Sequence, residues 1–88
     1  MTKRAIIVVD LQNEYWPNGN LPLENIEGAA ANAARVIAHG RDAGDLIVNV
    51  RHEMPDGPVF LAGSDGAEIN ETVAPGEGEP VITKNLPN

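Results

Sequence analysis

The sequence predicts an α/β fold in which helices cover both faces of a parallel sheet, a three-layer αβα arrangement. Two apolar runs, 5–9 and 46–50, are each followed by polar residues, and a helical pattern separates them. Runs that are apolar throughout, rather than alternately, are typical of strands buried on both faces of a parallel sheet. A strand, a helix and a second strand within about 45 residues form a βαβ unit with a right-handed crossover. With a third short run at 80–84, we expect this chain to supply about the first three strands.

The first strand is expected at 5–9, where alanine, isoleucine and valine lead to Asp10. The segment from Asp10 to Pro22 is rich in asparagine, glycine and proline, which predicts a loop. From about Glu24 to Ala43 the apolar spacing becomes helical. One stripe of this helix consists of Ile26, Ala30, Ala33 and Ile37, and Gly44 follows as the C-terminal stop.

The second strand, 46–50, ends at Arg51 and His52. Residues 53–79 are rich in glycine, proline and acidic residues, and predict a long loop with a short helical turn around 67–72. A loop of this length in a compact domain is usually functional. Residues 80–84 predict the third strand, and 85–88 a turn.

Composition excludes several classes of protein. The chain has 88 residues and a net charge of −7, and its six basic residues are scattered, which argues against binding of nucleic acid. There is no cysteine, hence no disulfide and no thiolate metal site. The first apolar run is too short for a membrane span or a secretory signal. We therefore expect a cytoplasmic protein without membrane contact.

The inventory of elements is incomplete for the predicted architecture. One helix cannot cover both faces of a parallel sheet, and the sequence stops just after a strand. We expect residues 1–88 to be the N-terminal half of a single domain whose C-terminal half is absent. The alternative is a complete small domain that oligomerisation stabilises. In the isolated chain, strand 5–9 would expose an unpaired apolar edge and should aggregate or pair with another chain.

Charged residues follow all three predicted strands. Asp10 ends the first strand, Arg51 and His52 end the second, and Lys84 ends the third. Ligands of open α/β sheets bind outside the carboxyl ends of the strands. A carboxylate beside an ammonium group stays ionised and can accept a proton from a nucleophile, while the ammonium stabilises the resulting anion. The alternative for Asp10 and Lys84 is a purely structural ion pair.

Four segments together resemble the isochorismatase-like cysteine hydrolases, whose fold is Rossmann-like. The matching segments are Ile6-Ile7-Val8-Val9-Asp10-Leu11-Gln12-Asn13, Val50-Arg51-His52, Gly63-Ser64-Asp65-Gly66-Ala67-Glu68-Ile69 and Val81-Ile82-Thr83-Lys84-Asn85-Leu86-Pro87-Asn88. Each motif alone is weak, but they occur in order and at the usual spacing over the whole chain.

The resemblance implies an Asp-Lys-Cys catalytic triad, in which Asp10 matches the general base and Lys84 the lysine. The cysteine of the family lies downstream, on the fourth strand–helix turn, and is missing from this chain. Implied substrates are small amides, ureido compounds or a vinyl ether, without a cofactor. Implied partners are the C-terminal half and further copies in a homo-oligomer. The competing hypothesis is a non-catalytic half-domain or pseudoenzyme that acts as an interaction module.

Three further residues are candidates for substrate binding: Gln12, Trp16 and His52. Gln12 resembles a family residue near the active site, and its alternative role is to cap the following turn. Trp16, with Tyr15, could form an aromatic wall or bury its loop against the core. His52 could line the pocket or form a hydrogen bond at a strand end. Because the segment after the second strand lacks the aspartate that binds metal in nicotinamidases, we expect no metal site.

Overall fold

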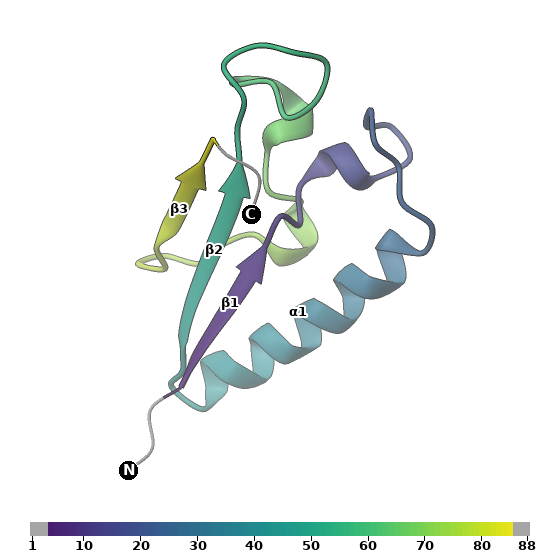
Figure 1. Cartoon of the computed structure of the whole chain (residues 1–88). Coiled ribbons are helices and arrows are strands. Elements are labelled where there is room, and N and C mark those ends of the chain that lie inside the picture. The colour runs from purple at the N-terminus through teal and green to yellow at the C-terminus, as the bar shows by residue number, and fades with distance from the viewer. Residues whose placement is uncertain (1–3, 86–88) are drawn as a thin grey trace.

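The structure, a computed structural model, describes residues 4–85 and is built on a sheet of three parallel strands (Figure 1). The strands are β1 (Ala5–Val9), β2 (Leu46–His52) and β3 (Val81–Lys84), in the order β1-β2-β3. The predicted parallel sheet is confirmed. The turn expected over 85–88 lies outside the described residues beyond Asn85.

The register brings the carboxyl ends of all three strands to one edge of the sheet. Val9 pairs with Val50, and His52 pairs with Lys84. β2 runs two residues further than its apolar run because its pairing with β3 continues through Arg51 and His52. The charged residues that follow the strands therefore share one end of the sheet.

Helix α1 (Ile26–Asp42) packs against one face of the sheet. The core between them consists of Val8, Ile37, Ile47 and Val73. At Gly40 the helix approaches the sheet so closely that a Cβ atom would collide with the side chain of Ile6. The helix ends where Gly44 adopts a left-handed conformation, φ +82°. Aliphatic packing thus holds the predicted helix in place.

The segment between β2 and β3 folds back over the loop that follows β1. It contains two 3₁₀ turns, η2 (Asp65–Ala67) and η3 (Glu71–Val73), and a third, η1 (Asn13–Tyr15), lies in the first loop. The prediction of a single helical turn around 67–72 is wrong for the middle of that range. There the chain is extended, because Ile69 pairs with Gln12 in an antiparallel bridge.

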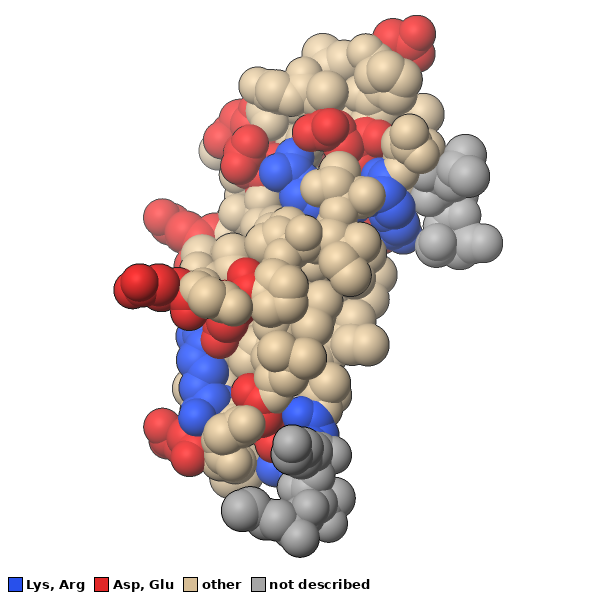
Figure 2. Space-filling view, turned by 90° about the vertical axis from the view of Figure 1, so that its left-hand side faces the viewer, with Lys and Arg blue, Asp and Glu red and all other residues tan. Residues whose placement is uncertain are grey.

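The sheet face opposite α1 is uncovered within residues 4–85. Ile7 and Val9 of β1 and Ile82 of β3 are each more than half exposed. Figure 2, which views the β3 side, shows uncharged surface between charged groups at both ends, with basic and acidic groups interspersed. Within the described part of the chain, α1 and the 3₁₀ turns are too short or too polar to cross a bilayer.

Candidate active site

Asp10 and Lys84 lie side by side at the carboxyl edge of the sheet. Lys84 Nζ is 3.3 Å from Asp10 Oδ2, and the two side chains are 18% and 25% exposed, respectively. They come from β3 and from the end of β1, with β2 between these strands. The pair therefore reaches across the end of the central strand.

The backbone of Asp10 turns sharply out of the sheet. Its φ is +58°, in the left-handed region that non-glycine residues seldom adopt, although aspartate tolerates it better than most. The Asp10 N–H donates to the Val50 carbonyl at 2.8 Å, which holds this turn against β2. Oδ1 of the same residue is buried and has no hydrogen-bond partner within residues 4–85. One carboxylate oxygen thus contacts the ammonium group, and the other has no hydrogen-bond partner among the described residues.

A cavity of about 340 Å³ opens beside this pair. It is lined by Asp10, Tyr15, His52, Met54, Val59, Phe60 and Lys84. Asp10 and Lys84 are the charged residues of this lining, and the other lining side chains are mostly aromatic or aliphatic. A cavity with few convergent polar groups is the usual form of a site for a small molecule.

His52 is the nearest strand neighbour of Lys84 and forms part of the cavity wall. Its Nε2 lies 3.1 Å from Met54 Sδ, and its ring packs edge-on against Phe60, with 5.2 Å between the ring centroids. His52 thus lines the cavity beside Asp10 and Lys84, and its part in substrate binding stays a prediction.

Gln12 is fully buried beneath the site. Its Nε2 donates to the carbonyls of His52 and Ala67 at 2.7 and 2.6 Å, and its Oε1 accepts the His52 N–H at 2.8 Å. The side chain contacts neither the carboxylate of Asp10 nor the cavity, and it does not cap the following turn. It joins the end of β2 to η2.

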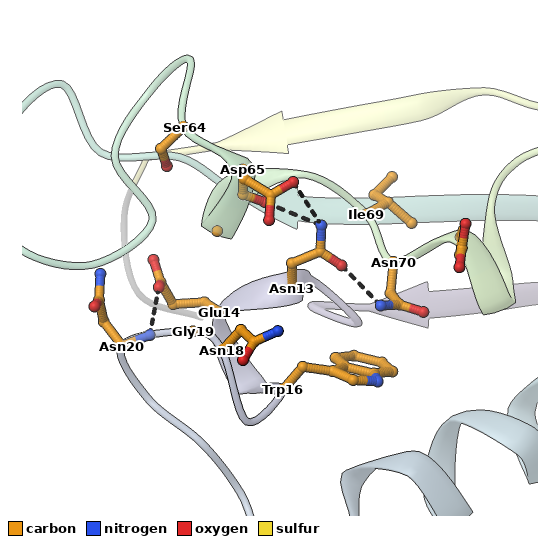
Figure 3. A pocket seen from close by; sticks show the side chains of 12 residues that line it. Asn13, Glu14, Trp16, Asn18, Gly19, Asn20, Ser64, Asp65, Ile69 and Asn70 are labelled. Atoms are coloured by element: carbon orange, nitrogen blue, oxygen red, sulfur yellow. Dashed lines mark hydrogen bonds between the residues drawn. The ribbon is translucent and has the colours of Figure 1, made fainter.

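Trp16 lies in a different cavity, of about 490 Å³, between the η1 and η2 turns (Figure 3). The polar groups there largely satisfy one another. Asn13 Nδ2 donates to the Asp65 carbonyl at 3.1 Å, and Asn70 Nδ2 donates to Asn13 Oδ1 at 2.7 Å. The structure therefore separates Trp16 from the acid–base pair.

Tyr15, rather than Trp16, is the aromatic residue of the first loop that lines the cavity beside Asp10. Burial raises the pKa of the Tyr15 hydroxyl, and the negative charges of Asp10 and Glu14 raise it further. The hydroxyl is therefore protonated at neutral pH, which makes it a hydrogen-bond donor beside the carboxylate.

Sequence reasoning missed Glu14, Met54 and Val59. Met54 and Val59 line the cavity, and Glu14 is a buried carboxylate between the two loops. No periodic pattern marks loop residues, so only their closeness to Asp10 and His52 in the sequence could have drawn attention to them. Within residues 4–85 no group of three or more histidine and acidic side chains could hold a metal ion.

Several known proteins are similar to this chain in sequence or in fold. The model of the isochorismatase domain matches residues 4–88. The isochorismatase family protein YddQ of Bacillus subtilis is 42% identical over 87 residues, which cover 96% of this chain and 48% of that protein. Maleamate amidohydrolase of Pseudomonas putida is 32% identical over 98 residues, covering 93% of this chain and 46% of the relative.

A solved structure shows the same arrangement of elements. The crystal structure of an isochorismatase hydrolase from Oleispira antarctica matches with a TM-score of 0.88 and 41% identity, over 97% of this chain and 49% of that one. The chain therefore spans about half the length of the relatives it matches.

Proposed function

Since this chain belongs to the isochorismatase family, we propose that it carries the acid–base pair of a cysteine hydrolase that acts on small amides. Asp10 is the general base, and Lys84 stabilises the thiolate. The 88 residues contain no cysteine, so the thiol comes from a segment outside them. We propose residues 1–88 as the N-terminal half of one hydrolase domain.

The observation that carries this proposal is that the two carboxylate oxygens of Asp10 have different surroundings. Oδ2 faces the ammonium group of Lys84, whereas Oδ1 is buried and has no partner within the described residues. A buried acceptor without a donor is costly, and such groups are concentrated where chemistry needs them. Oδ1 is therefore the atom that would take a proton from a thiol at the cavity.

The reaction follows from these roles. Asp10 removes the thiol proton, and the thiolate, stabilised by the charge of Lys84, attacks the amide carbonyl carbon. The C–N bond then breaks, and the nitrogen leaves with the proton returned by Asp10 as ammonia or an amine. Water, deprotonated by the same carboxylate, hydrolyses the thioester and frees the thiol.

An amide is the favoured substrate among the amides, ureido compounds and vinyl ethers of the family. Support comes from the relative named as a maleamate amidohydrolase, which matches 93% of this chain. The cavity wall formed by Val59 and Phe60 suits a short apolar group beside the scissile bond. Contacts of the substrate with Gln12 and with Trp16 stay predictions. The side chain of Gln12 is fully buried, and Trp16 lines a separate cavity.

The uncovered sheet face supports the proposal that another segment completes the domain. Exposed apolar side chains of β1 and β3, such as Ile7 and Ile82, need a covering layer in a three-layer fold. The C-terminal half that we propose as a partner would supply it. The expectations of a homo-oligomer and of a cytoplasmic location stay predictions.

The test uses the polypeptide that carries this chain together with the thiol. Ammonia release from small primary amides is measured for the wild type, for Asp10→Asn and for the control Asp42→Asn, whose carboxylate is exposed at the end of α1. We expect Asp10→Asn to lower kcat by about 10²–10⁴-fold, the usual contribution of a general base, and the control to leave it unchanged. Full turnover by folded Asp10→Asn would overturn the assignment of Asp10 as the general base. Absence of ammonia release by the folded wild type would favour the non-catalytic interaction module instead.

A further inference from the structure

Glu14 is a buried carboxylate that binds backbone groups of two different loops. Glu14 is only 2% exposed. Oε1 accepts the N–H of Asn20 at 2.8 Å, and Oε2 accepts the N–H of Phe60 at 2.5 Å. Of the ion pairs within residues 4–85, none includes Glu14. Because burial of a charge is costly unless donors compensate it, these two N–H groups hold the carboxylate in place.

The surroundings leave the Glu14 carboxylate little freedom to move. A Cβ atom at Gly66 would lie 2.6 Å from each of its oxygens, so η2 closes the third side of the group. Figure 3 shows the Glu14 side chain between the η1 and η2 segments, with its bond to the backbone of Asn20. The carboxylate thus joins the loop after β1, the loop after β2 and η2 at one point.

Phe60 connects the Glu14 carboxylate to the cavity, because its backbone binds Glu14 and the residue itself lines the cavity. Its φ is +52°, a conformation that a bulky side chain adopts only when its surroundings enforce it. The ring is buried and packs edge-on against Tyr15 and His52, with centroids 5.3 and 5.2 Å away. All three rings line the cavity that also contains Asp10 and Lys84.

We propose that Glu14 is a positioning residue that fixes Phe60 and thereby sets the shape of the substrate cavity. The carboxylate touches no part of the cavity itself and acts through the hydrogen bond to the Phe60 backbone. Its effect should therefore fall on substrate binding, whereas the acid–base pair is held separately by the strand ends. The expected effect on KM rests on the proposed function. The expected effect on the position of Phe60 does not.

The test compares Glu14→Gln with the matched control Glu27→Gln, whose carboxylate is exposed on α1. The isosteric amide can accept from only one of the two N–H groups and presents a donor to the other. In the intact enzyme we expect KM for small amides to rise about 10-fold or more, with kcat changed less than about 3-fold, since weakened binding alone raises KM. The amide proton of Phe60 should also exchange faster in Glu14→Gln than in the wild type or in the control.

A second variant, Phe60→Leu, removes the ring but keeps the backbone N–H. If Glu14 acts through the ring, then Glu14→Gln adds little to the rise in KM once Phe60 is leucine. Fully multiplicative effects of the two substitutions would overturn the proposal, and so would a fall in kcat at constant KM. Circular dichroism and thermal unfolding establish that each variant is folded.

If the intact protein showed no turnover, the proposed function would be overturned. The positioning role of Glu14 could still be tested, because the following measurement needs no activity. NMR contacts between the ring of Phe60 and the rings of Tyr15 and His52 report the cavity wall directly. We expect these contacts to weaken in Glu14→Gln and to persist in Glu27→Gln. Unchanged contacts and unchanged exchange at Phe60 in Glu14→Gln would overturn the positioning role, whatever the activity.

Discussion

Lys84 Nζ lies 3.3 Å from only one of the two carboxylate oxygens of Asp10. The residues are 74 positions apart in the sequence and belong to strands that are not neighbours in the sheet. They meet because parallel strands end at the same edge and because the left-handed turn at Asp10 points its side chain over the end of β2. The second oxygen is buried and has no hydrogen-bond partner within residues 4–85, and we propose that it is the atom that accepts the proton.

The role of Lys84 can be measured at the thiol itself. In the polypeptide that carries the nucleophile, Lys84→Met removes the positive charge that we propose stabilises the thiolate. We expect alkylation of the thiol by iodoacetamide at pH 7 to slow by about 10-fold or more, because the thiolate is the reactive form. Arg35→Met, which removes an exposed charge from α1, serves as the control. Equal alkylation rates in wild type and Lys84→Met would contradict this role.

Gln12 should be one of the main contributors to the stability of the site. Gln12→Leu leaves the N–H and C=O of His52 and the C=O of Ala67 without partners in a buried place. We expect the free energy of unfolding to fall by about 3 kcal/mol or more, since three buried groups lose their partners and each costs about 1–3 kcal/mol. Urea denaturation measures the loss, and Asn18→Ala, at an exposed position, is the control. A loss below about 0.5 kcal/mol would show that these bonds contribute little.

The ion pair between Arg41 and Glu79 gives the chain an acid-dependent contribution to stability. The side-chain hydrogen bond from Arg41 lowers the pKa of Glu79 to about 2, with a smaller contribution from the Gly76 N–H. A depressed carboxyl pKa stabilises the fold above the unfolded value of 4.5, and this stability is lost as pH falls toward 2. Both side chains are partly exposed, so solvent limits the contribution to about 1 kcal/mol or less.

The variant Glu79→Gln tests this linkage. We expect its free energy of unfolding to change less than that of the wild type between pH 4.5 and 2, the window set by the two pKa values. Glu77→Gln, at an exposed neighbouring position, should keep the wild-type pH dependence. Parallel curves for wild type and Glu79→Gln would argue against the pair.

The isolated 88-residue chain should associate with itself through β1. Ile7 is 62% exposed on the uncovered sheet face, and β1 is an edge strand of the described sheet. We expect size-exclusion chromatography with light scattering to show assemblies, and Ile7→Lys to shift them toward monomer. Val36→Lys, which places the same charge at an exposed apolar position of α1, should not. A compact wild-type monomer would refute the expectation.

The sheet, the helix and the closeness of Asp10 to Lys84 were predictable because they depend on short-range patterns. Uninterrupted apolar runs identified β1 and β2, helical spacing identified α1, and the topology of parallel strands then placed the charged ends together. Resemblance to the family was confirmed by the match over residues 4–88. The arrangement of the strands and the helix thus follows from the local hydrophobic pattern and from the rule that parallel strands end at one edge of the sheet.

The loops were not predictable in the same way, because their contacts join distant segments without periodicity. Nothing in the residues around Glu14 indicates that its carboxylate binds the Phe60 N–H, 46 positions away. The extended backbone at Ile69 likewise depends on its bridge to Gln12, and not on its own propensity. Tyr15 and Trp16 are adjacent in the sequence but line different cavities, since the η1 turn ends between them.

The most direct test of the proposed chemistry is whether Asp10 and Lys84 act as one unit. We would measure kcat/KM for small amides in the thiol-bearing polypeptide with Asp10→Asn, Lys84→Met and both substitutions. Groups that act together in one proton-transfer step lose their function together, so we expect the double variant to be no slower than the slower single variant. Wild-type kcat/KM in either folded single variant, or losses that multiply in the double variant, would contradict a shared catalytic role.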